Sequence, residues 1–361
     1  MNALRILGGG LAFALLVGCG VPRATGSRGV AFGMASGAES SGRPFTVLRF
    51  TPAGPNAAVT GSAVARHPSG DVVIAGVFVD TANVGLGPGS LGGGSAAFVG
   101  RYAPSGAPRW VRWVRNTSSL VPRVAVNAEG DVFFAGETQH APRPFGEPDP
   151  APCTDRPICK SGPALHALGE NGDVRWSRAL PAGDARERMT PELVDAGAGD
   201  VTIGGRFGTA DAFVARYDRQ TGERRWFTRV RQATATNLAV TADGEAFLVG
   251  SSFRDELVDD VRLPTGGITT THLLRLRAKD GVGEWAKSMA QHVAMGVLAI
   301  APDGHGDLLV VRRSATAHEL LAVETIAASN GATKRTRPLP MREGNATTAA
   351  IQAAPDGSAI V

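Results

Sequence analysis

The sequence is poor in several residues and patterns that mark large classes of protein. Its 361 residues include three cysteines, and Lys plus Arg exceed Asp plus Glu by only four, 37 against 33. No dense block of Lys or Arg is present, so we expect no surface that follows a phosphate backbone and no nucleic-acid partner. The sequence also lacks a GxSxG nucleophile elbow and a glycine loop followed by Lys and a helix. From the sequence we therefore assign no catalytic residue, no cofactor-binding residue and no metal ligand.

The N-terminal apolar run, Ile6–Val17, has twelve residues and is too short to cross a bilayer. It follows the basic segment Met1–Arg5, which is typical of a secretory signal peptide. The run ends in LVGC, which resembles the lipobox of bacterial lipoproteins, where the cysteine is lipidated and becomes the first residue after cleavage. The resemblance implies a signal peptide over residues 1–18, lipid attachment at Cys19 and a membrane partner reached through that lipid. Because Gly20 and not aspartate follows, it also implies the outer membrane; a coincidental cysteine in an ordinary signal peptide is the alternative.

The other two cysteines, Cys153 and Cys159, lie six residues apart in the segment CTDRPIC. In an exported chain this spacing favours a local disulfide. A metal-binding pair is the alternative, but no His or third Cys stands nearby at ligand spacing.

The segment after the signal peptide, residues 19–43, is rich in Gly, Ser, Ala and Arg and has no sustained periodicity. Such a composition predicts a flexible tether. We expect one folded domain over residues 44–361, where apolar runs alternate with Gly- and Pro-containing turns.

The clearest copy of a repeated hairpin is Asp211–Val230, which reads DAFVARYDRQTGERRWFTRV. Its first half alternates with the period of two that suits a strand, and its turn ends at a glycine, which can adopt a positive φ because it has no Cβ. A tryptophan follows that glycine after four residues, and the same offset recurs in three other places. The structural repeat residues are Gly106 and Trp110, Gly172 and Trp176, Gly222 and Trp226, and Gly281 and Trp285.

A second hairpin, with a glycine turn usually followed by Asp, precedes each copy of the first. Clear copies cover residues 62–76, 123–136 and 192–205, and weaker copies cover 237–250, 297–311 and 349–361. Together the two hairpins make a unit of four antiparallel strands, which we name A to D, with a repeat of about 45 to 70 residues. The sequence therefore predicts an all-β fold, a β-propeller of four-stranded blades.

The repeat starts and stops in the middle of a blade. The chain opens with a C and D pair over residues 45–58, with its turn at Gly54, runs through five whole units and closes with an A and B pair over 349–361. Joining the two pairs would complete a sixth blade and remove the exposed sheet edges at the chain ends. We therefore expect six blades, with a fragment of a larger ring as the alternative.

Antiparallel order divides the connections between two ends of the blades. The A–B and C–D turns are short and define what we call the short-turn end. The B–C and D–A connections include long segments at 79–95, 139–162 and 253–271, and they define the long-connection end. Because long loops on a rigid scaffold are where recognition usually resides, we expect a protein or glycan partner at the long-connection end.

Both hairpins resemble the SBBP-type β-propeller repeats of bacterial exported proteins and lipoproteins. The resemblance covers about residues 45–361 and fades toward the C-terminus. It implies the fold and an envelope location but no common activity. The matching residues are Gly70, Asp71, Gly76, Phe98, Val99, Gly106 and Trp110, and Gly199, Asp200, Gly205, Asp211, Phe213, Asp218, Gly222 and Trp226.

The segment YDRQTGERRW also resembles the pyrroloquinoline-quinone-type repeat of quinoprotein dehydrogenases and of their cofactor-free relatives, the outer-membrane assembly lipoproteins. One indole per blade suits packing between blades, so we favour packing over cofactor contact for the four tryptophans and expect no cofactor. Our hypothesis is a lipid-anchored envelope propeller that binds or scaffolds without catalysis. The alternative is a periplasmic oxidoreductase or hydrolase that uses the central channel.

The remaining polar residues form no convincing site. The densest acidic cluster is Asp255, Glu256, Asp259 and Asp260; it lacks a DxDxDG-like loop, so we favour a solvated loop over a Ca²⁺ site. The histidines show no i, i+2 or i, i+4 pair, which favours surface or turn positions over metal binding. They stand at positions 67, 140, 166, 272, 292, 305 and 318.

Overall fold

All the regular secondary structure of the described residues is β-strand. The chain divides into two compact units, Met1–Ala179 and Leu180–Val361, which are described separately below. Within the described part, no helix has the length and apolar character needed to cross a membrane. The computed structural model describes residues 30–34, 46–52, 58–84, 88–116, 121–138, 142–144, 162–181, 186–196, 199–252, 257–263, 270–290, 297–313, 321–339, 352–353 and 359–360.

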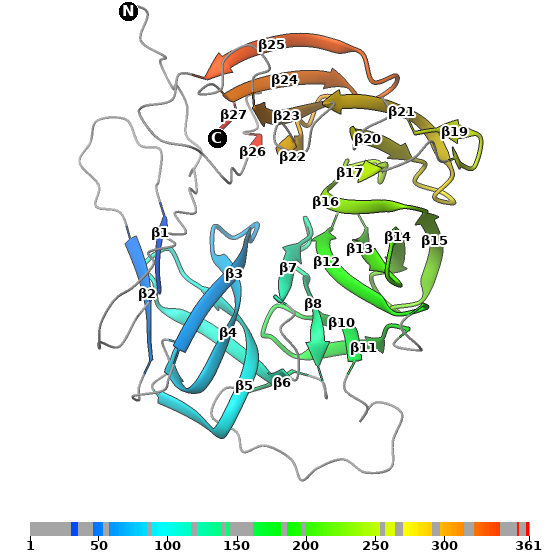
Figure 1. Ribbon diagram of the computed structural model, residues 1–361. Coiled ribbons are helices and arrows are strands. Elements are labelled where there is room, and N and C mark those ends of the chain that lie inside the picture. The colour runs from blue at the N-terminus through cyan, green and yellow to red at the C-terminus, as the bar shows by residue number, and fades with distance from the viewer. Residues whose placement is uncertain are drawn as a thin grey trace, which may run out of the picture. The chain divides into compact units, whose positions relative to one another are not determined.

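The first unit contains two antiparallel blades: blade 1 is four strands of a seven-stranded sheet that also includes β1, β2 and β9, and blade 2 is a four-stranded sheet (Figure 1). Blade 1 consists of β3 (Ala58–Arg66), β4 (Val72–Asn83), β5 (Pro88–Tyr102) and β6 (Pro108–Asn116). Blade 2 consists of β7 (Arg123–Val126), β8 (Val132–Thr138), β10 (Gly162–Leu168) and β11 (Val174–Ala179).

The second unit contains three blades of the same kind (Figure 1). Blade 3 is β12 (Met189–Asp195), β13 (Asp200–Phe207), β14 (Asp211–Asp218) and β15 (Arg224–Val230). Blade 4 is β16 (Ala233–Val240), β17 (Ala246–Ser252), β20 (Thr270–Leu276) and β21 (Gly283–Ala290). Blade 5 is β22 (Val297–Pro302), β23 (Asp307–Arg313), β24 (Leu321–Ala327) and β25 (Thr333–Leu339).

The A strands of consecutive blades are neighbours within each unit, which is how propeller blades are arranged around an axis. Strand β3 lies beside β7 in the first unit, and β16 lies beside both β12 and β22 in the second. The predicted all-β fold of four-stranded antiparallel propeller blades is confirmed, and the five whole A-to-D units fall where the repeats predicted them.

The first half-blade differs from the prediction. Strand β2 (Thr46–Pro52) does not form a hairpin with the segment after Gly54; it pairs with β1 (Val30–Met34), which lies inside the segment predicted as a tether. Ala58, the expected D-strand position, instead begins β3 and pairs with Val79. The A strand of blade 1 thus extends through the residues that were predicted to form the preceding D strand, because their backbone groups pair along β4.

The predicted long loop at 79–95 is also wrong, since most of it continues the β4–β5 hairpin. Thr81 pairs with Ser90 and Asn83 pairs with Pro88, while the register shifts after Val79. Residues 91–94, LGGG, are the extra residues on β5 at this shift, and Asp80 opposite them adopts a φ of 63°. A bulge absorbs the glycines that suggested a loop.

The last pair of strands, β26 (Gln352–Ala353) and β27 (Ala359–Ile360), is antiparallel as the A and B pair predicts. Joining it to the first strands would close a six-bladed ring between the two units, and this closure stays a prediction.

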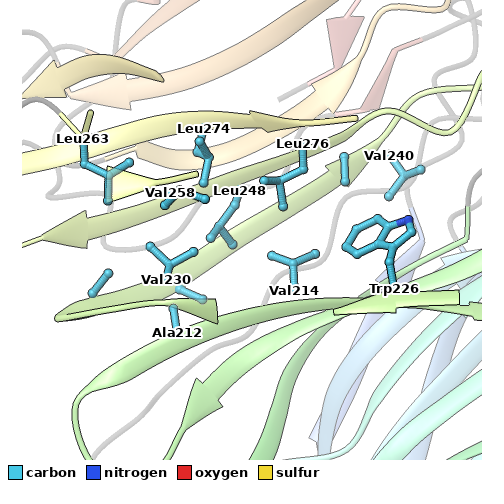
Figure 2. Close-up of a cluster of buried hydrophobic side chains, with 13 residues drawn as sticks. Ala212, Val214, Trp226, Val230, Val240, Leu248, Val258, Leu263, Leu274 and Leu276 are labelled. Carbon is cyan, nitrogen blue, oxygen red and sulfur yellow. The ribbon is translucent and has the colours of Figure 1, made fainter. Parts of the chain in front are cut away.

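The core lies between blades, as the interface of blades 3 and 4 illustrates. Figure 2 shows Val214 and Trp226 from blade 3 facing Leu248 and Leu276 from blade 4. Residues Asp211–Tyr217 of β14 are all buried, so both faces of this C strand are covered. Such a strand reads as a nearly continuous apolar run, and it buries enough apolar surface to hold neighbouring sheets together.

Candidate functional site

The short-turn end is built from turns whose glycines have left-handed backbone. Gly106, Gly172, Gly222 and Gly281 have φ values of 87°, 76°, 67° and 72°. This conformation is costly for any residue with a Cβ, which explains a glycine at the same turn position in each C–D hairpin.

Three tryptophans pack against the turn glycine of the next blade. A Cβ on Gly281 would lie 2.5 Å from the Trp226 ring, and a Cβ on Gly172 would lie 2.7 Å from the Trp110 ring. Each indole N–H also donates to a carbonyl of that turn: Trp110 to Glu170 O at 2.7 Å and Trp226 to Ala278 O at 3.0 Å. We call this contact between a D strand and the following C–D turn a seam.

The seam of blades 4 and 5 repeats the arrangement with Trp285, which donates to Ala328 O at 3.1 Å. A Cβ on Gly331 would lie 3.0 Å from this indole ring. The fourth repeat tryptophan, Trp176, contacts Phe133 of its own blade with ring centroids 6.2 Å apart.

A second part of each seam was missed by the sequence analysis: a buried arginine on the C strand. Arg216 donates to Asp200 Oδ2 at 2.9 Å within blade 3 and to Gly244 O at 2.7 Å in blade 4. Arg101 and Arg275 occupy the same register position in blades 1 and 4. The signal was present, because an acidic residue directly follows the A–B turn glycine and an arginine stands near the end of each of these C strands.

The seam between blades 1 and 2 contains a concavity of about 320 Å³. It is lined by Arg101, Arg109, Trp110, Glu170 and Asn171. Arg101 is buried and donates to Asp71 Oδ2 at 2.7 Å, whereas the side chains of Arg109 and Glu170 are 59% and 77% exposed. The concavity therefore combines a neutralised buried pair with two solvent-facing charges.

The long-connection end carries the exposed apolar residues of the described chain. Val79 at the B–C end of β4, Val121 in a D–A connection and Leu257 in a B–C connection are 37%, 46% and 60% exposed. Leu257 belongs to an additional hairpin of β18 (Leu257–Val258) and β19 (Val261–Arg262). In the first unit, β9 (Arg143–Pro144) adds to the edge of β6. These elements are not needed to build a blade.

The acidic cluster contributes a structural contact to the start of β21, next to the C–D turn of blade 4. Asp259 adopts a φ of 54° in the β18–β19 turn, and its Oδ2 accepts the Gly283 N–H at 2.8 Å. Asp255 and Glu256 lie outside the described residues. Among the described residues no group of three or more His, Cys, Asp or Glu side chains is placed to hold a metal ion.

Two of the histidines do not occupy the predicted surface or turn positions. His166 and His272 lie on the C strands of blades 2 and 4, and both are buried. Burial lowers the pKa of His166 to about 3 and the pKa of His272 to about 4. His166 Nδ1 lies 2.8 Å from Ser177 Oγ, but neither ring nitrogen of His272 has a hydrogen-bond partner. The alternation of strand residues was a sufficient signal, because each histidine stands among apolar residues in a C strand.

His67 does occupy a turn, the A–B turn of blade 1, and it is buried there. Its Nδ1 lies 2.8 Å from Ser69 Oγ, and a Cβ on Gly130 would lie 2.6 Å from its Nε2. Burial and then the charge of Arg101 lower its pKa. The predicted lipid and disulfide positions, Cys19, Cys153 and Cys159, lie outside the described residues.

The blades and seams define a β-propeller-type protein. No family model and no curated protein matches the sequence. Among solved structures, the chain is similar to a protein of unknown function from Bacteroides caccae, at 10% identity over 78% of this chain and 82% of that chain, with a TM-score of 0.42. It is also similar to a protein of unknown function from Dyadobacter fermentans DSM 18053, at 10% identity over 80% and 85%, with a TM-score of 0.42.

An enzyme is among the similar structures as well. A quinohemoprotein alcohol dehydrogenase from Pseudomonas putida HK5 matches at 14% identity over 77% of this chain and 44% of that chain, with a TM-score of 0.37. We take no activity, cofactor or partner from any of these likenesses.

Proposed function

We propose that this protein is a lipid-anchored binding module of the bacterial outer membrane, which holds a protein or glycan partner at its long-connection end and does not act as an enzyme. The observation that carries the proposal is the distribution of exposed apolar side chains. Val79 lies near the B–C end of β4, and Val121 and Leu257 belong to a D–A and a B–C connection. Exposed apolar residues and extra hairpins on the connections of a scaffold favour recognition of a partner there.

The short-turn end supports the same proposal by contrast. Side chains of the seam between blades 3 and 4 are used for contact between blades: Trp226, Arg216 and Thr228 of blade 3 each donate to a backbone carbonyl in blade 4. These contacts hold the blades rigidly and leave the opposite end free to present its hairpins.

The recognition surface is tested by site-specific photocrosslinking in intact cells. A crosslinking amino acid is placed at position 121 or 257, with position 220, an exposed residue of a short turn, as the matched control. We expect an envelope species to be captured from 121, from 257 or from both, but not from 220. Equal capture from all three positions, or capture only from 220, would place recognition elsewhere.

The anchor is tested separately with Cys19→Ala. We expect the wild-type protein to incorporate labelled palmitate and to sediment with outer-membrane vesicles, and the variant to do neither. A wild-type protein that is cleaved but carries no lipid would exclude the anchor without affecting the recognition surface.

A further inference from the structure

The concavity at the seam of blades 1 and 2 has an unusual balance of charge. Asp71, with a side chain only 4% exposed, is matched by the buried Arg101 at 2.7 Å. Arg109 reaches the same Asp71 oxygen only at 3.5 Å, and Glu170 lies 3.7 Å from Arg101 Nη1. One cation and one anion are thus left facing the concavity, and they form no ion pair with each other.

The equivalent position in blade 3 shows what a closed seam looks like. Arg225 precedes Trp226 as Arg109 precedes Trp110, but Arg225 is held by Asp200 at 2.9 Å and by Asp218 at 2.5 Å. Blade 1 has Ala103 at the position of Asp218, after the buried tyrosine of the C strand. The missing carboxylate explains why Arg109 has only the 3.5 Å contact with Asp71, although the two arginine side chains are similarly exposed, at 59% and 52%.

In blade 4 the residue before the seam tryptophan is acidic, not basic. Glu284 stands before Trp285, and it pairs with the half-buried Arg275 at 3.0 Å. Blade 1 therefore differs from blades 3 and 4 in that the residue before the tryptophan is not committed to a close ion pair.

The residues that line the concavity favour some classes of ligand over others. Trp110 is only 6% exposed and its N–H is bonded to Glu170 O, so it offers no open aromatic face for a sugar ring. A simple anion would meet Arg109 but also the exposed carboxylate of Glu170, whose contact with Arg101 is long, at 3.7 Å. A small zwitterion satisfies both charges, since a carboxylate suits the guanidinium and an ammonium suits the carboxylate.

We propose that the concavity binds a free α-amino acid, with its carboxylate on Arg109 and its ammonium on Glu170. The side chain of Asn171 adds an amide at the rim. The volume of about 320 Å³ and the largely charged lining favour small or polar amino acids over bulky apolar ones. The site belongs to the short-turn end and does not depend on the recognition surface proposed above.

The test is a titration of the full chain with ¹³C-labelled glycine, followed by NMR or calorimetry. Glycine is expected to bind in the millimolar range. N-acetylglycine, which lacks the ammonium, and glycinamide, which lacks the carboxylate, are each expected to bind at least about tenfold more weakly, because each loses one charge-assisted contact. This comparison uses the wild-type protein and so does not depend on the folding of a variant.

Variants then locate the site. Arg109→Gln and Glu170→Gln are each expected to weaken glycine binding at least about tenfold. Arg225→Gln in the seam of blades 3 and 4 is the matched control and is expected to leave glycine binding unchanged. Absence of glycine binding to the wild type, equal binding of N-acetylglycine, or loss of binding in Arg225→Gln would each overturn the proposal; the first result would mean that Arg109 and Glu170 pair with each other in solution.

Discussion

Strand β15 of blade 3 and strand β25 of blade 5 have the same place in their sheets and the same length, but their side chains have different environments. In β15, Trp226 and Val230 are buried against blade 4, whereas in β25 every residue from Thr333 to Pro338 is exposed. The position of the tryptophan is Arg335 in blade 5, and the position of the C-strand arginine is Thr325. The backbone pattern of a blade is therefore not what joins it to its neighbour; the seam side chains are.

Blade 5 receives a seam from blade 4, and among the described residues it donates no tryptophan seam of its own. Its Gly331 accepts Trp285 of blade 4, and Lys287 donates to Gly331 O at 2.9 Å. The two halves of a seam can thus be lost independently. A turn glycine serves the preceding blade, and a D-strand tryptophan serves the following one.

The largest difference between the two strands is expected when the aromatic ring of the D-strand tryptophan is removed. Trp226→Ala deletes a buried side chain and its bond to Ala278 O, so we expect the free energy of unfolding to fall by about 3–5 kcal/mol. Arg335→Ala removes an exposed side chain from the equivalent position and is expected to change stability by less than about 0.5 kcal/mol. Urea unfolding of both variants under one buffer condition measures the difference. Equal losses would mean that the D strand contributes through its backbone alone.

The sequence predicted the strands better than it predicted their partners. The period-two alternation and the glycine-to-tryptophan offset are local signals, and they located five blades. The pair of Arg216 with Asp200 within blade 3 has a sequence signal, but the contacts of Arg216 to blade 4 join residues 28 and 62 positions apart, and the repeat does not reveal them. The segment 91–94 was predicted as part of a loop because it is rich in glycine. In the structure these residues form a bulge, and the β4–β5 pairing continues on both sides of it.

Three glycine-to-alanine substitutions test the turn glycine, the part of the seam that is contacted by the tryptophan of the preceding blade. The Cβ of Gly281→Ala would lie 2.5 Å from the Trp226 ring, that of Gly331→Ala 3.0 Å from the Trp285 ring, and that of Gly304→Ala within 4 Å of nothing. All three glycines have positive φ, at 72°, 72° and 79°, so the backbone cost is shared at about 1–2 kcal/mol. We expect total losses of about 3, 2 and 1 kcal/mol, because overpacking adds to the first two.

Thermal or urea unfolding of the three variants gives the order. Equal losses at all three positions would show that the glycines are needed only for their backbone conformation. The rings would then shift without cost, and the description of the seam as a close contact between indole and turn would be wrong.

The pH-dependent comparison concerns His272, which lies near the long-connection end of the interface between blades 3 and 4. At the short-turn end of this interface the polar side chains described above are hydrogen-bonded, whereas the ring nitrogens of this histidine are not. His272 has no exposed surface, neither ring nitrogen is hydrogen-bonded, and burial lowers its pKa to about 4. Phe98 and Phe213 occupy the equivalent register positions in blades 1 and 3. His272→Phe therefore places in blade 4 the residue that the other two blades already have.

A folded-state pKa below the unfolded value of 6.5 means that the unfolded chain binds the proton more tightly. The neutral histidine is tolerated above pH 6.5, and stability is lost as the pH falls toward 4. We expect the wild type to lose about 2–3 kcal/mol more than His272→Phe between pH 7 and pH 4.5. The two proteins share His67, His166 and every carboxylate, so the difference between their urea midpoints at the two pH values isolates this one side chain. Parallel pH profiles would mean that the imidazole reaches water or a partner in the folded protein, and that this end of the seam is more open than its buried surface indicates.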